Sequence, residues 1–203
     1  RVLSLVIADK EDKMEIRTFG VVGAGQMGAG IAQVAAMSGL NVIMNDINEQ
    51  LVNKGLDGIT RLLGKSVEKG RMSSGDKDMI VSRIRTSVDL KDMEAADYVV
   101  EAASERPDIK FKIFSDLDSI CREQVILASN TSSIPIGRIA ANTKRPDRVA
   151  GMHFMNPVPV MQLVELIRGI ATSEDTYQTL VGVVDTLGKT AASAEDFPAF
   201  IVN

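Results

Sequence analysis

The sequence of 203 residues has one cysteine, one histidine, no long apolar run and no excess of basic residues. The single cysteine, Cys121, cannot form an internal disulfide, and such sparing use of cysteine is typical of a reducing compartment. One cysteine and one histidine cannot supply the ligands of a zinc enzyme, so we expect no metal. A membrane-spanning helix needs about 18 consecutive apolar residues, and the net charge is −4, so we expect neither a membrane nor nucleic acid as a partner.

Cys121 is expected to be a partly buried structural thiol, because the sequence offers it no obvious activating group. The chain begins at Arg1 with an apolar patch over residues 2–8 and a charged run over residues 9–13. This segment has no convincing cleavage pattern of a signal peptide. We interpret residues 1–15 as a leader or linker and residues 16–203 as one domain, since a hydrophobic content of 45% is enough for one substantial core.

What the sequence does contain is a glycine-rich stretch, from Phe19 to Gly30, around which the rest of the chain is organised. A short apolar run leads into Gly-x-Gly-x-x-Gly, and a pattern of helical spacing follows. In a turn between a strand and a helix, Gly23 avoids a side-chain clash, Gly25 lets the backbone approach a pyrophosphate, and Gly28 lets the helix pack closely on the strand. The free N–H groups at the start of that helix would hold the anion.

The residues after the glycines support a nucleotide site. Gly39 suits the end of the helix, and a second apolar run over residues 42–44 leads to Asn45 and Asp46. Asp46 follows Gly23 by 23 residues, near the spacing of the carboxylate that binds the ribose hydroxyls of NAD. The alternative is that Asp46 caps the next helix. The order of strand, glycines, helix, strand and acid favours the nucleotide site over this alternative, and the carboxylate of Asp46 favours NAD over NADP.

The remaining pattern predicts strands that alternate with helices. Strands are expected at residues 16–22, 41–44, 84–87, 97–102, 125–129, 149–154, 163–167 and 189–194. Helical spacing from residue 47 to 69, a break, and a further helix capped by Ser74 or Asp76 predict a helical hairpin at about residues 48–83. Helices are also expected at residues 110–121 and 174–187. This alternation predicts a Rossmann-type, doubly wound and mostly parallel sheet, with antiparallel last strands after the turn at residues 156–159.

Polar side chains follow several of the predicted strands. In a parallel sheet, ligands bind at the carboxyl ends of the strands. The polar residues predicted to lie at those ends are Glu101, Glu105, Asn130, Ser132, His153 and Asn156. Ser132 stands in a run of hydroxyls and an amide, which either caps the next helix or presents donors to a substrate.

His153 is the only histidine, and a lone histidine at the end of a strand is by default structural. If the two strands beside Pro159 fold back antiparallel, His153 stands opposite Glu165, within reach of a cross-strand contact. A carboxylate beside an imidazole fixes its tautomer and stabilises its charged form, which a general base requires. The alternative for Glu165 is an outward polar residue on an alternating strand.

Four segments together are similar to the L-3-hydroxyacyl-CoA dehydrogenase family, which includes bacterial 3-hydroxybutyryl-CoA dehydrogenases. The segments are residues 23–32, Ala128-Ser129-Asn130-Thr131-Ser132-Ser133, Gly151-Met152-His153-Phe154-Met155-Asn156-Pro157-Val158-Pro159-Val160-Met161, and Phe200-Ile201-Val202-Asn203. Gly188-Lys189 before the last strand also fits. Ala199 departs from the pattern, because the family usually has glycine after this proline. The resemblance covers residues 16–203.

For the cofactor, the resemblance implies NAD over the glycine-rich turn, with its adenosine ribose on Asp46. The turn residues that would touch NAD are Gly23, Gly25, Gln26, Met27 and Gly28. Glu105 and Lys110 match positions that contact the cofactor in the family.

For the substrate, the resemblance implies an acyl-CoA whose 3-hydroxyl lies against His153, Ser132 and Asn203. His153 would remove the hydroxyl proton, Glu165 would support its charged form, and Asn156 would help to position this pair and the substrate. The helical hairpin resembles the part of the family that binds the CoA tail. Its implied phosphate contact is Lys69, or else Lys65 or Arg71, and the alternative for all three is a solvated helix face.

The family also has a C-terminal helical domain, mostly after Asn203, which completes the cleft and forms a homodimer. The resemblance therefore implies that this chain is an NAD-binding domain that turns over poorly by itself. The implied activity is oxidation of an L-3-hydroxyacyl-CoA, or the reverse reduction of acetoacetyl-CoA, in β-oxidation or butanoate metabolism. The alternative is an inactive nucleotide-binding or structural domain of the same fold. A bacterial cytoplasm is the expected compartment, and a mitochondrion or peroxisome would suit the same chemistry.

Overall fold

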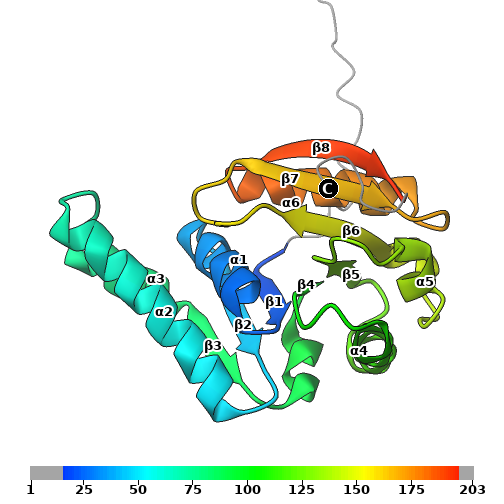
Figure 1. The fold of residues 1–203 in the computed structure, drawn as a ribbon, viewed down its shortest axis with the longest axis horizontal. Coiled ribbons are helices and arrows are strands. Elements are labelled where there is room, and N and C mark those ends of the chain that lie inside the picture. The colour runs from blue at the N-terminus through cyan, green and yellow to red at the C-terminus, as the bar shows by residue number, and fades with distance from the viewer. Residues whose placement is uncertain (1–15, 197–203) are drawn as a thin grey trace, which may run out of the picture.

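The structure is a computed structural model that describes residues 16–196. The predicted leader at residues 1–15 and the predicted substrate contact Asn203 lie outside the described residues. Figure 1 shows one central sheet with helices on both faces. Its strands are β1 (Thr18–Val22), β2 (Asn41–Asn45), β3 (Ile84–Ser87), β4 (Tyr98–Glu101), β5 (Ile126–Ser129), β6 (Val149–Phe154), β7 (Leu163–Arg168) and β8 (Thr190–Glu195).

The strands lie in the spatial order β3-β2-β1-β4-β5-β6-β7-β8. Strands β1 to β6 are parallel, β7 runs antiparallel to β6, and β8 is parallel to β7. The predicted doubly wound sheet with reversed last strands is therefore confirmed. The order of strands reverses between β1 and β4, and in such a sheet ligands bind in the crevice outside the carboxyl ends at this switch point.

The α-helices are also close to their predicted positions, whereas the two short 3-10 helices were not predicted. They are α1 (Gln26–Met37), α2 (Glu49–Glu68), α3 (Ser74–Ser82), α4 (Pro107–Ile120), α5 (Ile136–Ala140) and α6 (Glu174–Thr186), with short 3-10 helices η1 (Leu90–Ala95) and η2 (Pro146–Arg148). Helices α2 and α3 form the predicted hairpin, which stands out to one side of the sheet in Figure 1. None of the helices within residues 16–196 is long and apolar enough to cross a lipid bilayer.

Two helix caps differ from the prediction. The hydroxyl of Ser73 accepts a hydrogen bond from the Asp76 N–H at 3.0 Å, so Ser73 caps α3 and neither Ser74 nor Asp76 does. The side chain of Asn48 accepts from the Leu51 N–H at 2.9 Å, so the alternative role of Asp46 as the cap of α2 is wrong. An N-cap side chain accepts from the N–H of the second or third residue after it, and Asn48 and Ser73 do so for α2 and α3.

The core has two parts, one on each face of the sheet, because successive residues of a strand point to opposite sides. In β4, Tyr98 and Val100 belong to the cluster under α1, whereas Val99 belongs to the cluster that contains Phe114 of α4. The ring of Tyr98 lies 5.2 Å from the ring of Phe19 on β1. Burial of both faces explains why the central strands read as continuous apolar runs.

Candidate functional site

The glycine-rich turn joins β1 to α1, and two of its glycines are required by the backbone. Gly23 has a φ of +103°, and a Cβ there would lie 2.6 Å from the carbonyl oxygen of Ala102. A Cβ at Gly28 would lie 1.8 Å from the carbonyl oxygen of Gly23. Any side chain at these positions would therefore push α1 away from the end of the sheet.

Gly25, by contrast, is not required by the packing of the chain, because a Cβ there would meet no atom of the described chain within 4 Å. It would instead project into the space in front of α1. Gly25 is the N-cap of α1, makes no side-chain cap, and is followed by a first turn without acidic residues. The N–H groups at this end of the helix are thus available to an anion, and the turn fits the pyrophosphate of a dinucleotide.

Asp46 lies directly after β2 and beside the turn. Its Oδ2 accepts a hydrogen bond from the Ala24 N–H at 2.7 Å, and its Oδ1 accepts from the Ile47 N–H at 2.7 Å. These bonds hold the carboxylate next to the glycine-rich turn, where an acid suits ribose hydroxyls and would repel the extra phosphate of NADP.

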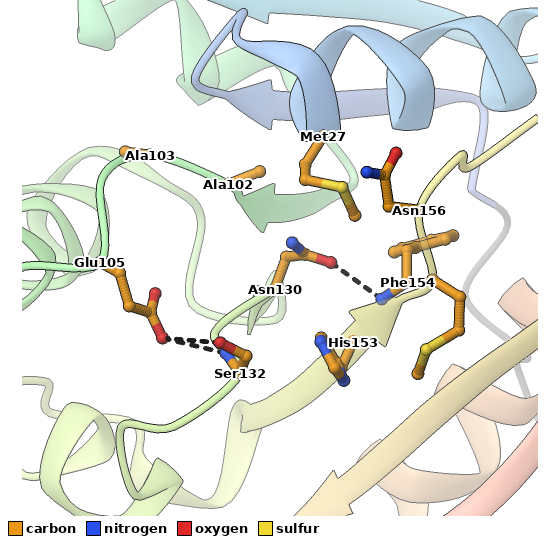
Figure 2. Close-up of a pocket in the computed structure, with 10 residues that line it drawn as sticks. Met27, Ala102, Ala103, Glu105, Asn130, Ser132, His153, Phe154 and Asn156 are labelled. Carbon is orange, nitrogen blue, oxygen red and sulfur yellow. Dashed lines mark hydrogen bonds between the residues drawn. The ribbon is translucent and has the colours of Figure 1, made fainter. Parts of the chain in front are cut away.

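A cavity of about 370 Å³ opens at the carboxyl ends of the central strands (Figure 2). It is lined by Met27, Ala102, Ala103, Glu105, Asn130, Ser132, His153, Phe154, Met155 and Asn156. The fold therefore brings Met27 of the glycine-rich turn to the same cavity as Glu105, Ser132, His153 and Asn156. These predicted site residues come from four separate segments of the sequence.

His153 and Glu165 are paired as predicted. They stand directly opposite each other in the antiparallel ladder of β6 and β7, and His153 Nδ1 lies 2.7 Å from Glu165 Oε2. Glu165 is fully buried and His153 is 8% exposed. The carboxylate on Nδ1 orients the ring, which is the arrangement that a histidine general base requires.

Asn130 lines the cavity, as its predicted place at the end of a strand indicated, but the sequence did not predict its partner. Its Oδ1 accepts a hydrogen bond from the Phe154 N–H at 2.8 Å, shown as a dashed line in Figure 2. The bond ties the end of β5 to the end of β6, immediately after His153. Its position directly after a buried strand was the available signal, but spacing does not reveal a partner 24 residues away.

Glu105 organises the turn that carries Ser132. Its Oε1 accepts from the Ser132 N–H at 3.0 Å, from the Ser133 N–H at 3.2 Å and from the Thr131 hydroxyl. Burial by itself would raise the pKa of Glu105, but the hydrogen bond from Thr131 and the ammonium of Lys110 outweigh it and lower the pKa. Glu105 is therefore ionised at neutral pH, and Figure 2 shows it beside Ser132 at one end of the cavity.

Lys110 is not among the residues that line the cavity. Its side chain is 1% exposed, and its Nζ lies 2.8 Å and 2.9 Å from the two carboxylate oxygens of Glu101 and 3.3 Å from Oε2 of Glu105. Glu101 is fully buried and also accepts from the Ser129 hydroxyl at 2.7 Å. The structure thus shows Lys110 as a support for Glu105, and its contact with the cofactor stays a prediction.

Gln26 and Lys69, two other predicted site residues, do not line the cavity. Gln26 donates from Nε2 to Asn156 Oδ1 at 3.0 Å, which links the glycine-rich turn to the segment after His153. Lys69 is the C-cap of α2 and is exposed on the hairpin, away from the cavity. Within residues 16–196, no group of three or more histidine, cysteine, aspartate or glutamate side chains is placed to hold a metal ion.

Residues 18–197 match the family model described as 3-hydroxyacyl-CoA dehydrogenase, NAD binding domain. The chain belongs to this family. Its predicted family and its predicted cofactor, NAD, are thereby confirmed, and the three glycines and Asp46 are the residues of this 3-hydroxyacyl-CoA dehydrogenase domain whose geometry fits NAD.

Relatives at high identity agree with this family. The chain is 49% identical over 190 residues to the Bacillus subtilis protein named "Probable 3-hydroxybutyryl-CoA dehydrogenase", and the match covers 94% of this chain and 66% of that protein. It is 47% identical over 188 residues to the 3-hydroxybutyryl-CoA dehydrogenase of Bradyrhizobium diazoefficiens, covering 93% and 64%. The chain therefore spans slightly less than two thirds of the length of these relatives.

The fold also agrees with solved structures. The crystal structure of (S)-3-hydroxybutyryl-CoA dehydrogenase from Ralstonia eutropha superposes with a TM-score of 0.91 at 48% identity, covering 93% of this chain and 67% of that one. The crystal structure of 3-hydroxybutyryl-CoA dehydrogenase from Escherichia coli superposes with a TM-score of 0.91 at 40% identity, covering 93% and 40%.

Proposed function

We propose that the protein oxidises L-3-hydroxyacyl-CoA thioesters to 3-oxoacyl-CoA with NAD, and reduces acetoacetyl-CoA in the reverse direction. The observation that carries this proposal is the buried pair of His153 and Glu165 at a cavity shared with the glycine-rich turn. A general base beside a dinucleotide site is what dehydrogenation of a hydroxyl requires. The relatives named as 3-hydroxybutyryl-CoA dehydrogenases support an acyl-CoA as the substrate and a short acyl chain.

Each residue of the site has a distinct task in this reaction. NAD, when bound, supplies the acceptor for the hydride from C3 of the substrate. His153 takes the proton of the 3-hydroxyl on Nε2, and Glu165 stabilises the resulting imidazolium through Nδ1. Ser132, held by Glu105, and Asn156, at the rim, position the substrate oxygen. In the reverse direction His153 returns the proton to the ketone oxygen.

The contacts of the CoA tail, the pathway, the compartment and the oligomeric state belong to the same proposal. Lys69 on the hairpin, with Lys65 and Arg71 as neighbours, would bind the phosphates of the CoA tail, and Asn203 would contact the substrate. We propose β-oxidation or butanoate metabolism as the pathway and a bacterial cytoplasm as the compartment, in line with the bacterial relatives. A homodimer formed through a C-terminal helical domain, as the family resemblance implies, completes the proposal.

The test is H153Q in the natural gene product, with reduction of acetoacetyl-CoA followed by the loss of NADH absorbance. We expect kcat to fall about 100-fold or more, because loss of a general base removes at least that much. The dissociation constant of NADH serves as the control and should stay unchanged, since the glycine-rich turn is intact.

Two results would contradict the proposal. Activity of H153Q within a few-fold of the wild type would show that His153 is not the base. A wild-type protein that binds NADH and turns over no acyl-CoA would favour the alternative of an inactive nucleotide-binding domain.

A further inference from the structure

Lys189 is a buried cation with an unusual set of partners. It lies directly before β8 and is 8% exposed. Its Nζ donates hydrogen bonds to the carbonyl oxygens of Val158 at 2.6 Å and Met161 at 2.7 Å. Within residues 16–196, Lys189 forms no ion pair with a carboxylate, and burial lowers its pKa. An ammonium held only by main-chain carbonyls is costly to bury, so its position calls for a reason beyond packing.

The two carbonyls belong to one segment, which we call the crossover turn and define as residues 155–162. This turn joins β6, which carries His153, to β7, which carries Glu165. The histidine and the glutamate are held by the ladder between these strands. The residues of the crossover turn lie outside that ladder, so their placement depends on contacts such as those of Lys189.

The crossover turn in turn touches the nucleotide site at two points. Val158 is 2% exposed and packs closely against Gly30 of α1. A Cβ added at Gly30 would lie 2.9 Å from the Cβ of Val158. Asn156 lines the cavity and accepts the hydrogen bond from Gln26 at 3.0 Å. Gln26 is the first residue of α1 and part of the glycine-rich turn.

We propose that Lys189 is a positioning residue for the cofactor site, acting through the crossover turn to hold Asn156 against Gln26. Lys189 holds the carbonyls of Val158 and Met161 in the crossover turn. Asn156 belongs to the same turn and contacts Gln26 of the glycine-rich turn. The inference rests on the NAD site of the proposed function and adds a residue that does not itself line the cavity.

The test compares K189M, N156A and the double variant K189M/N156A in the natural gene product. Methionine fills a similar volume and donates no hydrogen bond, so the buried carbonyl of Val158 and the partly buried carbonyl of Met161 lose their partner. We expect the dissociation constant of NADH, followed by its fluorescence, to rise about fivefold or more in K189M. On the N156A background the same substitution should add less than about twofold, because residues that act through one contact are not additive.

The matched control is K112M, since Lys112 is an exposed lysine on α4 whose ion pair within residues 16–196 is with Asp116 of the same helix. Its dissociation constant for NADH should equal that of the wild type. A K189M variant with unchanged NADH binding would overturn the proposal. Equal effects of K189M on both backgrounds would also overturn it, because they would show a general loss of stability.

If circular dichroism shows that K189M is unfolded, K189R replaces it in both backgrounds. A planar guanidinium keeps the charge but cannot place one nitrogen between the two carbonyls as the ammonium does. We therefore expect the same rise in the dissociation constant of NADH and the same non-additivity with N156A. Failure of wild-type protein to bind NADH would instead refute the nucleotide site of the proposed function. The two failures are therefore distinguishable.

Discussion

At the scale of single residues, Glu105 shows how one carboxylate can shape a site without reacting in it. One of its oxygens receives the N–H groups of Ser132 and Ser133, and the other faces the ammonium of Lys110 at 3.3 Å. The pKa of Glu105 is lowered because the hydrogen bond from Thr131 and the charge of Lys110 outweigh the effect of burial. The ionised form therefore stabilises the folded turn.

This shift has a consequence for E105Q. A carboxyl whose pKa is lower in the folded state adds stability above its usual pKa of 4.5, and this is lost as the pH falls through the lowered value. We expect E105Q to melt at a lower temperature than the wild type at pH 7, with a gap that narrows as the pH falls below about 4.5. Thermal unfolding followed by circular dichroism across this pH range measures it.

The control for E105Q is E123Q, a substitution of an exposed carboxylate after α4. Its melting temperature should follow that of the wild type at each pH. A gap for E105Q that stays constant with pH would show that the ionised carboxylate contributes nothing to the stability of the turn.

At the scale of elements, the connection from β1 to α1 is the part of the fold that determines whether a nucleotide can bind. Gly28 lets α1 approach the turn, and Gly25 leaves the space in front of the helix open. The two glycines look equivalent in the motif, but Gly28 is required for the packing of α1, whereas Gly25 leaves space for the ligand. Alanine at each position separates these roles.

We expect G25A to fold and to bind NADH poorly. The backbone at Gly25 has a φ of −66°, which alanine adopts, and loss of a glycine N-cap costs about 1 kcal/mol or less. Its methyl group would occupy the space of the pyrophosphate and raise the dissociation constant of NADH about tenfold or more.

We expect the matched variant G28A to be destabilised by about 3 kcal/mol or more, because its Cβ would overlap the carbonyl of Gly23. Urea unfolding and NADH titration of both variants make the comparison. Normal NADH binding by a folded G25A would show that the anion does not approach the turn at this position.

At the scale of the whole molecule, the sheet separates two apolar clusters, and Cys121 lies in the one under α4. It is 5% exposed, and burial raises its pKa to about 11. A thiol with this pKa has little thiolate at neutral pH, and the surrounding side chains block a reagent. Cys121 is therefore a structural residue, as the sequence indicated, although it is buried rather than partly buried. It can report global unfolding.

We expect no reaction of Cys121 with Ellman's reagent in the native protein at pH 7.5 over an hour. In guanidinium chloride the 203-residue chain, which contains one cysteine, should release about one equivalent of thionitrobenzoate. C121A is the control and should release none. Rapid stoichiometric reaction of the native chain would contradict the burial of this thiol.

The sequence by itself determined the features that depend on short spacing. The glycine-rich turn and Asp46 follow from local backbone requirements and the length of one strand-helix-strand unit. The pairing of His153 with Glu165 follows from the symmetry of one antiparallel turn about Pro159, and the register confirms it. Periodicity predicted the order of strands and helices along the chain, but it missed the caps Asn48 and Ser73 by one to three positions.

Only the tertiary structure decided which distant side chains meet. Glu105 reaches Ser132 across 27 residues, Asn130 reaches Phe154 across 24, and Lys189 reaches Val158 across 31. Parallel strands are joined by crossovers of variable length, so no fixed spacing in the sequence brings their ends together. The contacts that position the site form where neighbouring strand ends meet in the sheet, and that arrangement results from packing both apolar faces at once.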